Sequence, residues 1–123
     1  MDTIIKINLV LRFLLEITAC IAMGMWGWRQ GTGWTRWLLS IGTPLLAVVL
    51  WGTFAVPNDP SRSGHAPVPI PGVLRLGYEC LFFGFASWAL YRTMGSHWGW
   101  GFAAIVVLHY AIAYQRLFWL IRQ

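Results

Sequence analysis

The segment WLLSIGTPLLAVVLWGTFAV, residues 37–56, runs for twenty positions without a charged side chain. A helix of that length rises about 30 Å, which matches the hydrocarbon core of a bilayer. Three further apolar segments of similar length cover about residues 4–28, 73–91 and 98–120. Because backbone groups in lipid must be hydrogen-bonded within the chain, we expect all four segments to be membrane-spanning helices.

The composition of the whole chain agrees with a membrane protein. Its 123 residues are 58% hydrophobic and only 11% charged, whereas a soluble domain carries about 25% charged residues. Many of the nine tryptophans lie near the expected span ends, as in the aromatic belts at the two membrane surfaces. The net charge of +5 is spread over single basic residues, so we expect contact with anionic membrane lipid and no nucleic-acid partner.

The connections between the segments divide the chain into two halves. Residues 29–36 and 92–97 form short connections that contain glycine and charge, which favours two tight antiparallel hairpins. Residues 57–72 hold five of the six prolines, and such a segment is typically stiff and partly extended. We expect one transmembrane domain over residues 1–123, with this proline-rich loop at its middle.

The two hairpins carry a repeated motif. The tripeptide VLR at residues 10–12, followed by Glu16, reappears at residues 73–75, followed by Glu79, at an offset of 63. Two spans restore the original direction of the chain, so such a repeat is parallel, with its two-fold axis along the membrane normal. The predicted fold is therefore all-α: an integral membrane four-helix bundle built from two similar helical hairpins.

The repeated Arg and Glu residues are the first candidate site. Each charge near the bilayer centre costs roughly 2.5–3.5 kcal/mol, so these side chains must pair, face the protein interior or line water. Arg12 and Glu16 lie one turn apart on one helix face, as do Arg75 and Glu79. If the two helices are parallel neighbours, Arg12 can meet Glu79 and Arg75 can meet Glu16.

The last segment adds His109, with Arg116 seven residues further on the same helix face. Three interpretations of the resulting cluster stay open. It is a static structural network, a proton or ion relay, or an anion or lipid-headgroup site. The residues involved are Arg12, Glu16, Arg75, Glu79 and His109.

The proline-rich loop is the second candidate site. It is either a rigid linker or a cap in which Asp59 and Arg62 reach toward the charged cluster. Elsewhere the chain carries no metal-ligand spacing, phosphate loop or catalytic motif, and Cys20 and Cys80 are isolated. We therefore expect no metal, no cofactor and no enzymatic activity.

Three motifs give the chain a family resemblance: Arg12 with Glu16, the heptapeptide WGTFAVP at residues 51–57, and Arg75 with Glu79. With these motifs the chain resembles the YrdB-like family of small uncharacterised bacterial membrane proteins along nearly its whole length. The resemblance implies a four-span protein of the bacterial inner membrane, and it implies no activity. Small multidrug-resistance exporters also have four spans and a central Glu, but they lack the second Glu and the proline-rich loop.

Two functions follow as hypotheses. The first is an ion or small-solute transporter or channel subunit that uses Glu16 and Glu79. The second is a structural or accessory membrane protein in which the cluster only fixes helix packing. A bundle this small offers little surface for a complete pathway, so we also expect it to form a homo-oligomer. Small residues within the segments should permit close helix contact, namely Gly24, Gly27, Gly42, Gly84 and Ala86. The side that carries the two termini and the middle loop holds four basic residues against three on the other side, so we expect both termini in the cytoplasm.

Overall fold

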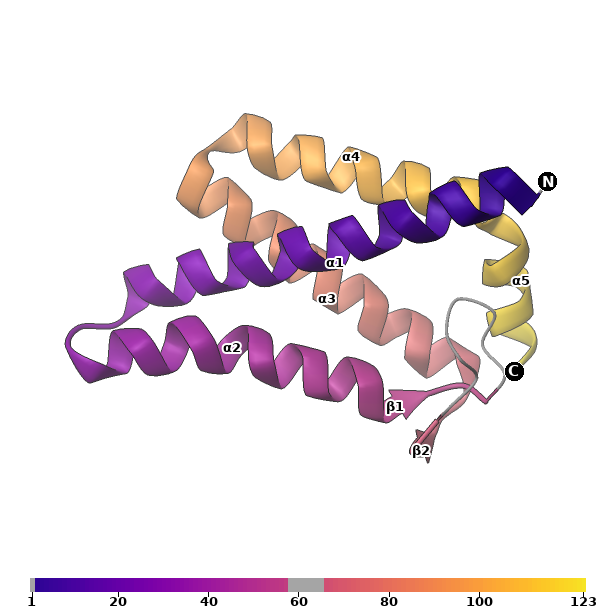
Figure 1. Ribbon diagram of the computed structural model, residues 1–123, viewed down its shortest axis with the longest axis horizontal. Helices are drawn as coiled ribbons and strands as arrows, with labels where there is room; N and C mark the ends of the chain where they lie inside the picture. The colour runs from indigo at the N-terminus through magenta and orange to yellow at the C-terminus, as the bar shows by residue number, and fades with distance from the viewer. Residues whose placement is uncertain (1, 58–65) are drawn as a thin grey trace.

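The computed structural model describes residues 2–57 and 66–123, which are almost entirely helical (Figure 1). In chain order the elements are α1 (Asp2–Gln30), α2 (Trp34–Thr53), β1 (Phe54–Ala55), β2 (Val68–Pro69), α3 (Gly72–Met94), α4 (Ser96–Ile112) and α5 (Tyr114–Arg122). Three of the helices, α1, α2 and α3, are long and apolar enough to cross a membrane, and α4 and α5 are together long and apolar enough as a bent pair. The prediction of a helical chain with apolar, span-length helices is confirmed.

The helices α1 and α3 form the middle of the molecule. They pack against each other, while α2 packs on α1 and α4 packs on α3. Both hairpin turns lie at one end, and the termini, α5 and the two short strands lie at the opposite end (Figure 1). The charged motifs of α1 and α3 therefore lie on neighbouring helices.

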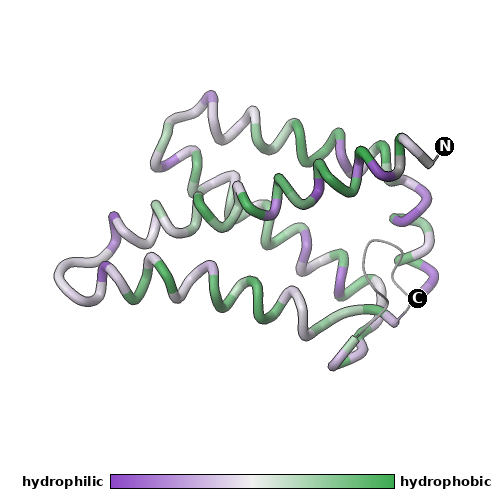
Figure 2. Tube along the Cα trace, in the orientation of Figure 1, coloured by the Kyte–Doolittle hydropathy of each residue, from purple (hydrophilic) through white to green (hydrophobic). Residues whose placement is uncertain are grey.

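The core is built from the facing sides of these two central helices. Its buried side chains include Leu15, Ala19 and Met23 of α1 and Phe82 and Ala86 of α3. The outer faces are apolar as well, and none of the α2 residues is fully buried. Figure 2 shows hydrophilic positions interrupting the apolar stretches of α1, α3 and α5, where the charged cluster forms.

Small residues allow close helix contact at some of the expected positions. A Cβ added at Gly27 would overlap the backbone of Leu39, and one added at Gly24 would lie 3.2 Å from the Ser40 carbonyl oxygen. Ala86 is buried in the core. By contrast, Gly84 has open space beside it, so not every glycine expected to support close contact does so. Gly42, expected in the same role, meets only Leu38 of its own helix at 3.9 Å.

The expected single helix over residues 98–120 differs from the structure. The helix α4 ends at Ile112, and α5 begins at Tyr114 after a bend of 73°. Ala113, at φ −92° and ψ 30°, leaves the helical conformation. The 17 residues of α4 already rise about 25 Å, and α5 is amphipathic, with Arg116 and Leu120 buried on one side. Hydropathy alone could not separate the two helices.

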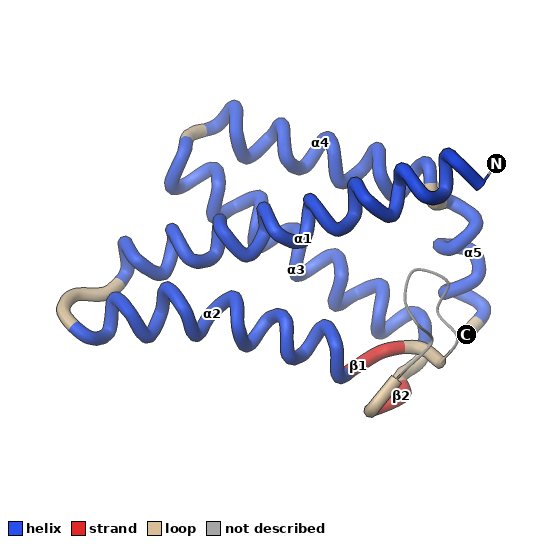
Figure 3. Tube along the Cα trace, in the orientation of Figure 1, coloured by secondary structure: helices blue, strands red, loops and turns tan. Residues whose placement is uncertain are grey.

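The proline-rich segment returns to the same end of the molecule. Phe54 pairs with Val68 and Ala55 with Pro69 in a short parallel ladder, and the Ile70 amide donates to the Ala55 carbonyl oxygen at 2.9 Å (Figure 3). This pairing fixes the path of the chain from α2 into α3. Asp59 and Arg62, the expected cap, lie outside the described residues.

Candidate functional site

Glu79 is the centre of a buried polar network. Its side chain is fully buried, and both carboxylate oxygens accept from neighbours on several helices. Oε2 lies 2.9 Å from Arg75 Nε, 3.1 Å from Arg12 Nη2 and 2.8 Å from Arg116 Nη2. Oε1 accepts from Arg116 Nη1 at 3.0 Å and from the Tyr110 hydroxyl at 2.5 Å. One carboxylate thus joins α1, α3, α4 and α5.

Arg116 makes a two-pronged contact with this carboxylate. Its two terminal nitrogens each bind one oxygen of Glu79, which is the strongest arrangement for an arginine–carboxylate pair. The bend at Ala113 lets α5 turn toward α3 and deliver the guanidinium group. At Gly72 an added Cβ would overlap the backbone of Leu120, so α5 also lies directly against the start of α3.

Arg75 connects the network to the end of α2. Its Nη1 donates to the carbonyl oxygens of Trp51 at 2.5 Å and Phe54 at 2.7 Å. The last carbonyl groups of a helix have no partner within the helix, and a positive charge there is favourable. The Arg75 guanidinium also stacks over the Trp51 ring, 4.3 Å from its centroid. Arg75 is therefore a buried cap for α2.

Arg12 links the network to α1. It lies 3.5 Å from Glu16 on its own helix and 3.1 Å from Glu79 on α3. Its guanidinium carbon lies 5.0 Å from the centroid of the Trp51 ring, on which Arg75 also stacks. The indole ring of Trp51 therefore contacts two arginines from different helices.

His109 extends the network toward the start of α1. Its Nδ1 lies 2.9 Å from Asn8 Oδ1, and its Nε2 lies 3.4 Å from Arg12 Nη1. An arginine only donates, so Nε2 must accept and the ring proton belongs on Nδ1, where it is donated to Asn8. Asn8 Nδ2 in turn donates to the His109 carbonyl oxygen at 3.4 Å. His109 thus acts as a neutral bridge between two buried side chains.

The predicted site residues come together, but not in the symmetric pattern expected. Arg12 does reach Glu79 across the helix interface. Arg75 pairs with Glu79 of its own helix, and Glu16 pairs with Arg12 of its own helix. The expected exchange of partners between two equal pairs is therefore replaced by a network that converges on Glu79.

Sequence reasoning missed two contributors to this network, Tyr110 and Trp51, and the direct pairing of a third, Arg116. Tyr110 carried no signal, because a tyrosine in an apolar helix is ordinary. Trp51 appeared only as a motif residue, with no indication that it contacts arginine. Arg116 had been placed on the face of His109, but its direct pairing with Glu79 depends on the bend at Ala113, which no glycine or proline marks.

The hydrogen bonds and ion pairs within this site limit the ligands that it could bind. Within residues 2–57 and 66–123, no three His, Cys, Asp or Glu side chains come together to hold a metal ion. Glu79 has five contacts of hydrogen-bond length, which leave little room for a further ligand on its oxygens. The arrangement favours a fixed polar network over a reactive one.

Comparison with known proteins agrees with the sequence motifs. Residues 10–107 match a family described as "Protein of unknown function (DUF2568)". The chain is also 38% identical to "Uncharacterized protein YrdB" of Bacillus subtilis (strain 168), over all 123 residues and the full length of both proteins. The chain belongs to the YrdB-like family. No solved structure matches this member of the YrdB-like family.

Proposed function

We propose that this YrdB-like protein is a non-catalytic, structural or accessory membrane protein whose Arg–Glu network locks its helices together. One observation carries the proposal: the carboxylate of Glu79 is completely buried and binds groups from α1, α3, α4 and α5. Through Arg75 the same network reaches the end of α2. Every described helix is therefore connected to one residue.

The energetics of buried charges support a fixed role. Removing one partner of a buried ion pair typically costs about 3–5 kcal/mol, because the other charge stays buried without compensation. Here three guanidinium groups depend on the same carboxylate. An ion or proton that used Glu79 as a transport site would have to displace several of them in every cycle.

Transport remains a second candidate because of Glu16. Its side chain is 28% exposed, whereas that of Glu79 is fully buried, so Glu16 is the carboxylate better placed to exchange partners. A transporter or channel subunit of this family would then use Glu16 for coupling and Glu79 for structure. This assignment narrows the hypothesis of two equivalent coupling sites.

Reconstitution in liposomes separates the two candidates. Proton and cation flux would be measured for wild type, Glu16→Gln and Glu79→Gln, with circular dichroism and gel filtration to check folding. The structural proposal predicts no flux in wild type and a folding defect confined to Glu79→Gln. Flux that disappears in a well-folded Glu16→Gln variant would overturn it in favour of transport.

The repeat and the membrane topology also belong to this proposal. At the offset of 63, Arg29 of the first hairpin donates to the carbonyl oxygen of Arg92 at 3.3 Å, so two corresponding residues meet at the turn end. This contact supports a parallel repeat. We assign both termini and the proline-rich loop to the cytoplasmic side of a bacterial inner membrane. Reporter fusions at Met1 and Gln123 measure the side on which each terminus lies. If both reporters are external, the proposed orientation is wrong and the opposite one holds.

Self-association stays a prediction. The outer face of α2 is apolar along its length and offers a surface for lipid or for a second copy. Chemical crosslinking in membranes, followed by denaturing electrophoresis, measures whether dimers form. A strictly monomeric protein under those conditions would remove this part of the proposal and leave the structural lock unaffected.

A further inference from the structure

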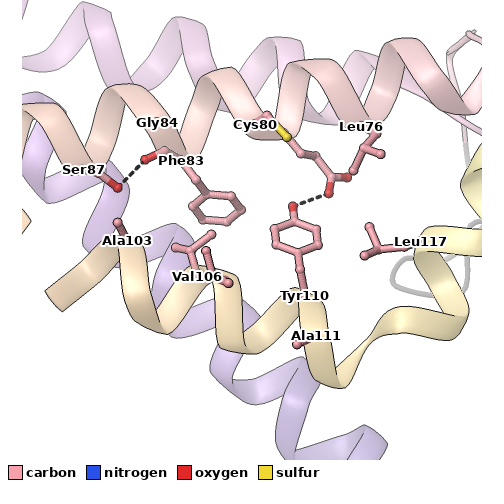
Figure 4. Close-up of a pocket in the computed structure, with 12 residues that line it drawn as sticks. Leu76, Cys80, Phe83, Gly84, Ser87, Ala103, Val106, Tyr110, Ala111 and Leu117 are labelled. Atoms are coloured by element: carbon pink, nitrogen blue, oxygen red, sulfur yellow. Dashed lines mark hydrogen bonds between the residues drawn. The ribbon is translucent and has the colours of Figure 1, made fainter. Parts of the chain in front are cut away.

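The helices α3 and α4 enclose a groove that borders the polar network at Glu79 and Tyr110 and is otherwise lined mostly by apolar side chains. They touch closely near their turn, where a Cβ added at Gly99 would lie 2.6 Å from Tyr91 Cβ. From there they diverge toward α5 (Figure 1). Figure 4 shows Phe83, Val106 and Tyr110 on the walls of the space between them. Its volume is about 570 Å³, within the range of ligand sites in proteins.

The lining of the groove is suited to hydrocarbon. It consists mostly of apolar side chains. The polar groups among them are engaged within the protein: the Tyr110 hydroxyl donates to Glu79, and the Ser87 hydroxyl donates to the Phe83 carbonyl oxygen at 2.8 Å (Figure 4). A polar solute would gain little here, whereas an apolar chain would restore the dispersion contacts that an empty groove lacks.

The groove lies on the outer surface of the helix pair. Gly84 and Val107 belong to its lining and are both exposed, Val107 to 69%. In the membrane placement proposed above, this surface faces the acyl chains of the bilayer. Lipid therefore reaches the groove directly, without crossing the protein.

The dimensions of the groove select its occupant. From Leu76 to Ser87 the lining extends over twelve residues of α3, about 16 Å of helix, which is close to half of the roughly 30 Å hydrocarbon core. Dividing 570 Å³ by this length gives a cross-section of roughly 35 Å². A long, narrow space of this kind matches one extended hydrocarbon chain lying along α3.

We infer that the α3–α4 groove is a binding site for one acyl chain of a membrane phospholipid. The chain lies along Phe83, Gly84 and Val106, and the headgroup lies at the level of α5. The inference rests on the proposed membrane placement and not on the role of Glu79. It assigns to this face a lipid partner in place of a second protein chain.

Gly84 provides a sharp test, because a Cβ at this position meets nothing within 4 Å. Gly84→Leu should therefore fold normally while its side chain fills the groove. Gly101→Leu is the matched control: its Cβ also meets nothing within 4 Å, and Gly101 does not line the groove. The probe is phosphatidylglycerol with a diazirine in the middle of one acyl chain, mixed into liposomes that contain the protein.

After irradiation, mass spectrometry locates the crosslinked peptides. We expect labelling concentrated in α3 and α4 of wild type and Gly101→Leu, and reduced several-fold in Gly84→Leu. Labelling that is unchanged in Gly84→Leu, or spread evenly over all helices, would overturn the inference. In a Cys20→Ala background, efficient bismaleimide crosslinking of Cys80 between two chains would also overturn it, because a second copy would then cover the groove.

Discussion

The two Arg–Glu pairs share one sequence motif and have different surroundings. Glu79 is fully buried and binds three arginines and a tyrosine, whereas Glu16 is 28% exposed and pairs with Arg12 at 3.5 Å. The difference arises in the outer parts of the hairpins. At the offset of 63, Tyr110 corresponds to Ala47 and Arg116 to Thr53.

This comparison shows that a repeated motif does not guarantee a repeated environment. A carboxylate is stable in an apolar interior only when enough donors surround it. The second hairpin supplies those donors from α4 and α5. In the first hairpin, the corresponding positions of α2 hold Ala47 and Thr53, and the Thr53 hydroxyl donates to the Val49 carbonyl oxygen of its own helix. The central helices therefore carry the motif, and the outer helices determine how deeply its carboxylate is buried and which donors bind it.

The largest expected effect comes from neutralising each carboxylate separately. Glu79→Gln leaves three buried guanidinium groups without their common partner, so we expect a loss of at least about 3–5 kcal/mol in unfolding free energy, or failure to assemble. Glu16→Gln should cost less, because Arg12 keeps Glu79 as a partner at 3.1 Å. Unfolding in mixed micelles, followed by circular dichroism, measures both. Equal losses would show that the two sites are energetically equivalent.

The next effect tests what α5 contributes to the difference. Arg116→Gln removes both contacts with Glu79, and we expect a loss of about 2–4 kcal/mol together with faster proteolysis near Ala113. Arg116→Lys keeps the charge but cannot make the two-pronged contact, so its loss should be intermediate. If proteolysis near Ala113 is as slow in Arg116→Gln as in wild type, the guanidinium group does not hold α5 in place.

A smaller effect is expected at Trp51, which supports Arg12 and Arg75 together. Trp51→Leu removes two cation–π contacts, each worth roughly 0.5–2 kcal/mol, whereas Trp51→Phe keeps an aromatic face. We therefore expect Leu to destabilise the protein by about 1–3 kcal/mol and Phe by less. The same unfolding assay applies. A Phe variant as unstable as the Leu variant would assign the effect to side-chain size.

The sequence alone was sufficient to predict the long helices and the meeting of Arg12 with Glu79. Apolar length fixes a spanning helix because lipid offers the backbone no partner, and buried charges must find opposite charges. The convergence of side chains from several helices on Glu79 could not be predicted in this way. It depends on the bend at Ala113, which no glycine or proline marks and which brings Arg116 and Leu120 against α3.

The prolines illustrate the same limit. Their density predicted a stiff, partly extended connection, and the short ladder between Phe54–Ala55 and Val68–Pro69 agrees with it where the chain is described. That this connection places the Phe54 carbonyl oxygen on Arg75 was not predictable. Such a contact between distant backbone and side chain is fixed by tertiary packing and leaves no pattern in the sequence.

The smallest expected effect concerns Gly77, which corresponds to Leu14 in the first hairpin. A Cβ at Gly77 meets nothing within 4 Å, so Gly77→Leu should gain about 0.5–1 kcal/mol from helix propensity alone. Gly27→Leu is the contrasting variant, because its side chain would overlap the backbone of Leu39 and separate α1 from α2. If Gly77→Leu is instead less stable than wild type, the surface of α3 around Gly77 is covered by a partner. The two hairpins would then differ on the exposed faces of their central helices as well as in their buried charges.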